Sequence, residues 1–191
     1  MSRKIYQIQI SLKDFQPKIW RRAFIPSDLL LSDVHKIIQT CMGWTNSHLH
    51  QFIKNDVIFT HKSPELDYDD TIQVDYKNIK LSDLLKKEKE RIIYEYDFGD
   101  GWEHDIILEK ILAFDKDTRY PVCLDGEMNC PPEDCGGAFG YSDLLDILKN
   151  PDHEEYESYI EWLGGEFDPE YFDKKKVNEL LQEEDYGCIE F

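Results

Sequence analysis

The sequence feature that most constrains the fold is the dipeptide Asp100-Gly101, which stands between two apolar runs. Asp-Gly is a favoured pair for a two-residue β-hairpin turn, because both residues tolerate the positive φ angles that such a turn needs. Residues 92–98 and 102–112 are therefore predicted to be the two strands of a hairpin. With this turn, Asp97 is expected to face His104 across the pair of strands.

A second pattern, in the N-terminal part of the chain, indicates two pairs of strands on either side of a helix. Apolar residues recur at helical spacing from Leu30 to Cys41, and Gly43 is expected to end that helix. The order β-β-α-β-β predicts an α+β fold with a grasp-like roll, a small sheet wrapped on one helix. The hairpin around Asp100-Gly101 then follows as a second hairpin. The strands of the roll are predicted at residues 6–12, 19–25, 49–53 and 57–60.

The rest of the chain divides by composition. Residues 113–140 are rich in Pro, Gly and Cys without clear periodicity, which predicts an irregular loop, and loops of this length are often functional surfaces. Residues 141–191 carry apolar residues at helical spacing and are predicted to be helical. We therefore expect a single α+β domain over residues 1–191, with a mixed core of sheet and helix at 1–112.

The charge of the chain is strongly acidic and unevenly placed. The 40 Asp and Glu residues outnumber the 22 Lys and Arg residues and give a net charge of −18, so most of the surface is expected to repel nucleic acid. Residues 1–54 are the exception, with eight basic and three acidic side chains. Either this basic third docks against the acidic remainder, or it contacts DNA in a mobile-element accessory protein. The candidate DNA contacts are Arg3, Lys4, Lys13, Lys18, Arg21 and Arg22.

Cysteine usage and hydropathy indicate the compartment. The five cysteines are odd in number and irregularly spaced, unlike the disulfide framework of a small secreted protein. The sequence has no apolar run long enough to span a membrane and no apolar segment of the signal-peptide type. We expect a cytoplasmic protein with reduced thiols and no contact with membranes.

Aromatic, acidic and Gly residues gather around the predicted hairpin turn and form the first candidate site. An Asp97–His104 contact would favour the charged imidazole and fix its tautomer, although such a pair also serves simply to hold the strand register. The sequence places no nucleophilic Ser or Cys beside this pair, so the pattern favours ligand binding over a catalytic set. The predicted ligand-binding residues, near the junction with the 121–140 loop, are Trp44, Asp97, Asp100, Trp102 and His104.

Three histidines are the first candidate ligands for a divalent metal. His48 and His50 are two residues apart on a predicted strand and so point to one side, and a turn at Asn55-Asp56 would place His61 opposite His50. With Asp97 or Asp100 at the second hairpin, these histidines or His104 would make the chain a metal-dependent enzyme. The alternative is that His48 and His61 lie on exposed strand ends and do not converge.

Three cysteines form a second candidate metal site. Cys123, Cys130 and Cys135 are spaced C-x6-C-x4-C, unlike the paired C-x2-C of zinc fingers, and they are one ligand short of a closed zinc site. The alternative is that these thiols are small buried hydrophobic groups.

Several motifs taken together resemble one family. They are IWRR at 19–22, MGW at 42–44, HLHQF at 48–52, YDFGDGWEH at 96–104, CPPEDCGG at 130–137 and GEFDP at 165–169. In this order the chain resembles the Ri-plasmid open-reading-frame-3-like family of prokaryotic proteins over nearly its whole length. The resemblance implies an α+β domain and no assigned biochemical activity. One relative is a transposon passenger protein labelled a resolvase, but Ser11 lacks the Arg cluster of a serine recombinase, so that label is not transferred.

These observations support three functional hypotheses of different classes. The leading hypothesis is a non-enzymatic binding or interaction module whose site lies near the second hairpin and the 121–140 loop. The alternatives are a metal-dependent enzyme that uses His and Asp or Cys ligands, and a mobile-element protein that contacts DNA.

Overall fold

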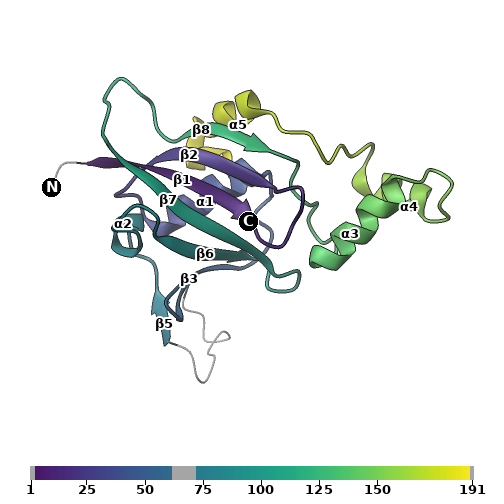
Figure 1. Cartoon of the computed structure of the whole chain (residues 1–191), viewed down its shortest axis with the longest axis horizontal. Coiled ribbons are helices and arrows are strands. Elements are labelled where there is room, and N and C mark those ends of the chain that lie inside the picture. The colour runs from purple at the N-terminus through teal and green to yellow at the C-terminus, as the bar shows by residue number, and fades with distance from the viewer. Residues whose placement is uncertain (1–2, 62–71, 190–191) are drawn as a thin grey trace.

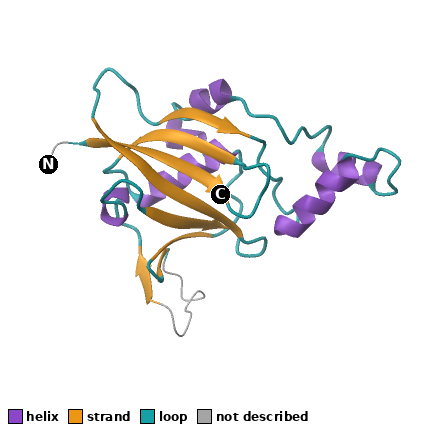
Figure 2. Ribbon diagram, viewed as in Figure 1, coloured by secondary structure: helices purple, strands orange, loops and turns teal. Residues whose placement is uncertain are grey.

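One mixed, mainly antiparallel sheet of eight strands forms the centre of the protein (Figures 1 and 2). The structure, a computed structural model, describes residues 3–61 and 72–189. The strand order is β5-β4-β3-β6-β7-β1-β2-β8, and only the β4–β5 pair is parallel. The strands are β1 Lys4–Leu12, β2 Trp20–Pro26, β3 His50–Lys54, β4 Val57–Thr60, β5 Ile72–Asp75, β6 Arg91–Tyr96, β7 Trp102–Ala113 and β8 Val122–Glu127.

Five helices accompany the sheet in the described residues. Helix α1 lies across one face of the sheet, whereas α3 and α4 project to one side of it (Figure 1). The longest helices have 12 residues, well short of the ~20 that cross a bilayer, so none of the described helices can span a membrane. The helices are α1 Leu31–Met42, α2 Leu81–Leu84, α3 Gly137–Leu148, α4 Tyr156–Leu163 and α5 Lys174–Leu180, and a 3-10 turn, η1, follows at Glu184–Gly187.

The two faces of the sheet differ because apolar and polar residues alternate along its strands. Ile8 and Ile10 of β1 are fully buried and pack in the same core as Ile37 and Ile38 of α1. The opposite face carries polar side chains, such as Gln9 between the two isoleucines. A one-sided core of this kind needs a helix over a single face, and α1 supplies it.

The sequence predicted the α+β class correctly, but the grasp-like roll is not confirmed. The hairpin β6–β7 lies between the two N-terminal pairs of strands, because β3 pairs with β6 and β7 pairs with β1. The strands around α1 therefore do not close into a small sheet of their own. Strand β7 is 12 residues long and pairs over nine positions with β1, which joins both halves into one sheet.

The register of the second hairpin differs from the prediction by three residues. Tyr96 pairs with Trp102, so His104 faces Tyr94 and not Asp97. Asp97 adopts a positive φ of 56°, and its Oδ1 accepts hydrogen bonds from the backbone N–H groups of Gly99 and Asp100 at 2.9 and 3.3 Å. This Asx-type turn starts the loop at Asp97, before the Asp-Gly pair on which the prediction was centred.

The segment 113–140, predicted to be irregular, contains regular structure at two places. Strand β8 lies within it and pairs with β2 at one edge of the sheet, and helix α3 begins at Gly137. Strand β8 has only a short apolar stretch, and its pairing partner is about 100 residues away in the chain, which local sequence patterns do not reveal. The remainder of the segment connects these elements and carries the CPPEDCGG motif.

Candidate cation-binding site

The tip of the β6–β7 hairpin and the segment before α3 meet at one end of the sheet. The backbone N–H of Gly136 donates to Asp100 Oδ2 at 3.2 Å. A Cβ atom on Gly137, which has a φ of +67°, would lie 2.6 Å from the carbonyl oxygen of Asp100. Glycine at this position therefore allows the close approach of the two segments.

Three carboxylates surround one imidazole nitrogen at this junction. His48 Nε2 lies 3.2 Å from Asp134 Oδ1, 3.6 Å from Asp97 Oδ2 and 3.8 Å from Glu133 Oε2. We call these four residues the carboxylate cluster. Its members come from the residues before β3, from the hairpin tip and from the segment before α3, so the fold brings together three distant parts of the chain.

Glu133 is held in place by hydrogen bonds that leave one of its oxygens near His48. Its Oε1 accepts from the backbone N–H of Thr45 at 2.8 Å and from the Tyr96 hydroxyl at 3.0 Å. Burial and the neighbouring Glu133 raise the pKa of Tyr96, so the phenol keeps its proton and acts as a donor. The Tyr96 oxygen in turn accepts from the backbone N–H of Ser47 at 3.0 Å. This network fixes the carboxylate before any ligand arrives.

Tight local turns place the other two carboxylates of the cluster, those of Asp97 and Asp134, near His48. The Asp97 side chain is 9% exposed, and since its Oδ1 is used within the turn, Oδ2 is the atom that faces His48. Asp134 has a φ of 57° and a side chain that is 71% exposed. The cluster is therefore closed on the Asp97 side and open to solvent on the Asp134 side.

The spacing of these atoms fits the coordination of a small divalent cation. His48 Nε2 is buried and makes no hydrogen bond within the described residues, although three carboxylates stand near it. The ligand atoms of His48, Asp97 and Asp134 all lie within 4.8 Å of one another. A tetrahedral zinc ion with bonds of about 2.0–2.2 Å separates its ligand atoms by roughly 3.3–3.6 Å, close to the 3.2 and 3.6 Å seen around His48.

Three of the five predicted ligand-binding residues are core side chains. Trp44, Trp102 and His104 are exposed by only 6%, 2% and 0%, so they cannot wall an open cleft. The His104 ring lies edge-on to Trp44 at 5.1 Å, and burial lowers its pKa to about 4. The other two, Asp97 and Asp100, do lie at the hairpin tip, where Asp97 joins the cluster and Asp100 binds Gly136.

Of the three histidines predicted as metal ligands, His50 and His61 both lie against Tyr76, but His48 does not join them. Strands β3 and β4 pair in the predicted register, in which His50 faces His61. His48 precedes strand β3 and points to the carboxylate cluster, whereas His50 is the first residue of the strand and points into the core. There it stacks on His35 at 3.4 Å and contacts the Tyr76 hydroxyl at 2.8 Å. His61 is exposed at the far end of β4, beside Tyr76. The same-side rule failed because His48 lies outside the strand.

The three cysteines predicted as a metal site are also separated, and the described residues contain no thiol-based metal cluster. Cys123 forms a thiol hydrogen bond with Cys41, which raises the pKa of Cys41 and lowers that of Cys123. Cys130 is buried, and Cys135 is half-buried with a pKa raised to about 12 by burial. Cys123 and Cys130 are buried near Arg21, whereas Cys135 lies near the carboxylates of Asp100, Asp134 and Glu133.

The basic N-terminal residues do not form a free cationic patch. Arg3 pairs with Asp28 at 2.9 Å, Arg22 donates twice to Glu109 at 2.7 and 2.8 Å, and Lys13 pairs with Glu103. Arg21 is buried, with an exposure of 2%. Of the six candidate DNA contacts, Lys4, Lys18 and Arg21 form no ion pair within the described residues. Much of the basic third thus docks against acidic side chains of the sheet.

Glu133 and Asp134 belong to the cluster but were not singled out from the sequence. The usable signal was their place between Pro131-Pro132 and Gly136-Gly137, where tight turns force neighbouring side chains outward. The positive φ of Asp134 is the feature that turns its carboxylate toward His48, and sequence alone does not specify it.

Comparisons with known proteins match the chain over most of its length. A family model described as plasmid pRiA4b ORF-3-like protein matches residues 4–176. The uncharacterized protein y4hQ of Sinorhizobium fredii is 34% identical over 165 residues, which cover 86% of this chain and 83% of that protein. A crystal structure of a protein of unknown function, MM3350 from Methanosarcina mazei, superposes with a TM-score of 0.82 at 38% identity. That match covers 93% of this chain and 99% of the other.

Proposed function

The chain belongs to the plasmid pRiA4b ORF-3-like family, and we propose that it is a binding module whose site takes a divalent cation at the carboxylate cluster. His48, Asp97 and Asp134 would hold the ion, and Glu133 would stand beside it. The chemistry of this donor set, one imidazole and carboxylate oxygens, suits zinc or manganese.

The observation that carries the proposal is the position of His48 Nε2. It is buried without a hydrogen bond among the described residues, and it faces three carboxylate oxygens at 3.2–3.8 Å. Three carboxylates at such short separations repel one another, and a single imidazole cannot offset all three negative charges. A divalent cation would satisfy both the nitrogen and the excess negative charge. The open Asp134 side would give the ion, and a ligand bound to it, access from solvent.

The test is calorimetric titration of the chelator-treated protein with zinc and with manganese, together with elemental analysis of the protein as purified. We expect one equivalent to bind. Replacing a ligand, as in His48→Gln, should weaken binding by more than the roughly 10–100-fold that changes in supporting residues cause. The matched control is His61→Gln, because His61 is an exposed histidine outside the cluster.

A second control addresses the acidity of the chain. With a net charge of −18, weak binding of cations at many surface carboxylates is expected. Asp143→Asn removes an exposed carboxylate on α3 and should leave the single strong site unchanged, while Asp134→Asn weakens it. If His48→Gln and His61→Gln bind zinc equally well, the cluster is not the site and the proposal is wrong.

A metal-dependent hydrolase is a second candidate function, favoured by the position of Glu133. Three protein ligands leave a fourth position for water on a zinc ion, and Glu133 Oε2 lies 3.8 Å from His48 Nε2 without belonging to the group of three. It would accept a proton from that water. Hydrolysis of an activated phosphodiester or ester by the zinc-loaded protein tests this function. Glu133→Gln should abolish turnover and retain zinc, and absence of any turnover excludes these substrates.

A further inference from the structure

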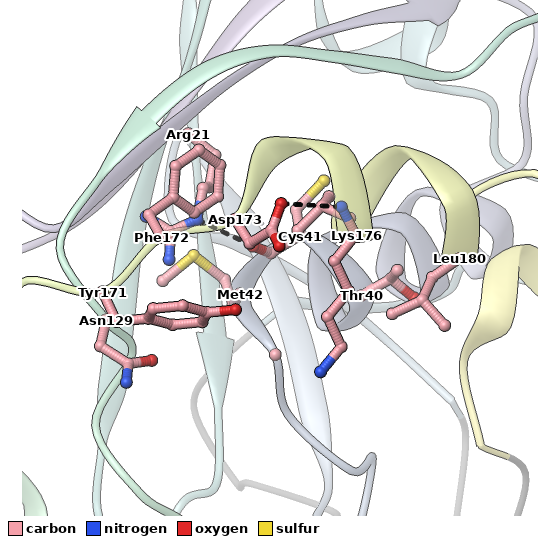
Figure 3. A pocket seen from close by; sticks show the side chains of 12 residues that line it. Arg21, Thr40, Cys41, Met42, Asn129, Tyr171, Phe172, Asp173, Lys176 and Leu180 are labelled. Atoms are coloured by element: carbon pink, nitrogen blue, oxygen red, sulfur yellow. Dashed lines mark hydrogen bonds between the residues drawn. The ribbon is translucent and has the colours of Figure 1, made fainter. Parts of the chain in front are cut away.

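A second site lies where the end of α1 meets the start of α5, away from the carboxylate cluster. Figure 3 shows a pocket of about 300 Å³ lined by residues of β2, α1, the segment before α3 and α5. Its volume is at the lower end of the range of small-molecule sites, about 300–1,000 Å³. No residue of the carboxylate cluster lines it.

Arg21 is the unusual member of this pocket, because its charge is buried without a carboxylate partner. It is 2% exposed, and its Nε and Nη1 donate to the backbone carbonyl oxygens of Cys41, Trp20 and Glu127, each at 2.8 Å. No Asp or Glu among the described residues forms an ion pair with it, and its Nη2 has no hydrogen bond there. Burial lowers the pKa of the guanidinium.

The guanidinium is held rigidly at one end of the pocket. Its carbon lies 4.2 Å from the centre of the Phe172 ring, and Figure 3 shows the guanidinium beneath that ring. A planar donor fixed by three carbonyl oxygens and one ring loses little freedom when a ligand arrives. Such preorganisation is typical of an arginine that recognises a carboxylate.

Lys176 adds a second cation to the lining. Figure 3 shows its side chain extending from α5 along the pocket, and it forms no ion pair within the described residues. Asp173 is the one acidic side chain of the lining, and its Oδ1 accepts from the backbone N–H of Lys176 at 3.0 Å as the N-cap of α5. The lining therefore carries one net positive charge in a chain whose net charge is −18.

The remaining walls include the apolar side chains of Met42, Phe172, Val177 and Leu180. Apolar walls with a few fixed polar groups are the usual composition of a small-molecule site. We propose that this pocket binds a small organic carboxylate with an aromatic or aliphatic body, whose carboxylate contacts Arg21 and is attracted by the positive charge of Lys176. The body of the ligand would lie against Met42 and Phe172.

The experiment uses the methionine methyl groups of the whole chain as local probes. The chain has three methionines, and Met42 is the one that lines the pocket. We expect millimolar phenylacetate to shift the methyl resonance of Met42, assigned with Met42→Leu. Phenylacetamide has the same shape without the charge and should produce no shift. Inorganic phosphate, which lacks the apolar body, should bind more weakly than phenylacetate.

Two lysine variants locate the contact without disturbing the core. Lys176→Gln should weaken phenylacetate binding about two- to fivefold, because it removes the attraction of one exposed cation. Lys175→Gln is the matched control on the same helix, because Lys175 does not line the pocket and pairs with Glu179 at 3.6 Å. It should bind phenylacetate as the unmodified chain does.

Three outcomes would overturn the proposal. If neither phenylacetate nor the aliphatic hexanoate shifts Met42 at millimolar concentration, the pocket is not a carboxylate site. If phenylacetamide or phosphate shifts Met42 as strongly as phenylacetate, the ligand class is wrong. If Lys175→Gln and Lys176→Gln weaken binding equally, the effect is one of overall charge and not of this pocket.

Discussion

The two ends of the segment Asn129–Asp134 lie in regions of opposite charge. At one end, Asn129 lines the pocket around Arg21. At the other end, Glu133 and Asp134 approach His48. The first region holds a buried cation that is surrounded by backbone carbonyl oxygens, and the second gathers carboxylates around a single imidazole.

The difference between these regions is in how the charge is balanced. Carbonyl dipoles partly compensate the Arg21 guanidinium and also fix its position, so it is part of the folded core. In the carboxylate cluster the negative charges exceed what His48 offsets, and Asp134 remains 71% exposed. The first region therefore contributes strongly to stability, whereas the second is expected to be only weakly stable until a cation binds.

The middle of the segment ties the two regions to the core. Trp44 Nε1 donates to the carbonyl oxygen of Pro131 at 3.0 Å, and Trp44 packs on the buried ring of His104. A change in this core is therefore expected to disturb both ends, whereas changes at one end should remain local.

Acid should produce the largest effect, because it acts on the shared core. Burial lowers the pKa of His35 and of His104 to about 4, and that of His50 well below its ordinary value. The folded state thus keeps these rings neutral, while the unfolded chain binds protons near pH 6.5. The free energy of unfolding therefore has its full value above pH 6.5. It falls as the pH drops from 6.5 toward 4, by about 3 kcal/mol for each of His35 and His104.

Urea unfolding at several pH values measures this loss. A free energy of unfolding that stays constant from pH 7 to about pH 4.5 would show that the buried histidines do not control acid stability. His104→Gln should reduce the pH dependence, since the substituted residue does not titrate.

Replacing Arg21 should produce the next largest effect. Its neighbour in the chain, Arg22, provides the comparison. Arg21→Met leaves three buried carbonyl oxygens without their donor, so we expect a loss of about 3–5 kcal/mol. Arg22→Met removes only a partly exposed ion pair with Glu109 and should cost about 1 kcal/mol or less. Urea unfolding of both variants is the measurement, and equal losses would contradict the contrast.

The contrast between Arg21 and Arg22 also shows what the sequence could have predicted. The strand pattern was correct, and alternation along β2 places Arg21 on the buried side with Ala23 and Ile25. The residue was nevertheless counted among the candidate DNA contacts because of its charge. The positional pattern was the better guide, since the protein interior supplied carbonyl acceptors for the guanidinium.

The carboxylate cluster could be predicted only in part from sequence patterns. Turn chemistry predicted the second hairpin, and the Pro and Gly content of the loop identified the segment that meets it. The exact partners could not be predicted, because they depend on the positive φ angles of Asp97 and Asp134 and on a three-residue shift in register. Edge strands β5 and β8 were missed for a related reason, since their pairing is decided by tertiary contacts.

A bound cation should stabilise the carboxylate cluster. At a free zinc concentration 100 times the dissociation constant, the folded state gains about 2.7 kcal/mol, which raises the melting temperature by roughly 5–11 °C for a chain of this size. Thermal unfolding with zinc and with excess chelator measures this difference. An equal rise in His48→Gln would assign the gain to another site.

Asp134→Asn should produce the smallest effect, and its sign should depend on the cation. Without zinc, the substitution removes one exposed charge from a group of carboxylates, so the free energy of unfolding should rise by no more than about 0.5 kcal/mol. With zinc present, the same variant loses part of the cation's stabilisation and should be less stable than the unmodified protein. Thermal unfolding of both proteins, each with zinc and with chelator, provides the four values. A change of the same sign in both conditions would mean that Asp134 is an ordinary surface residue, and the open side of the cluster would then have no role in binding.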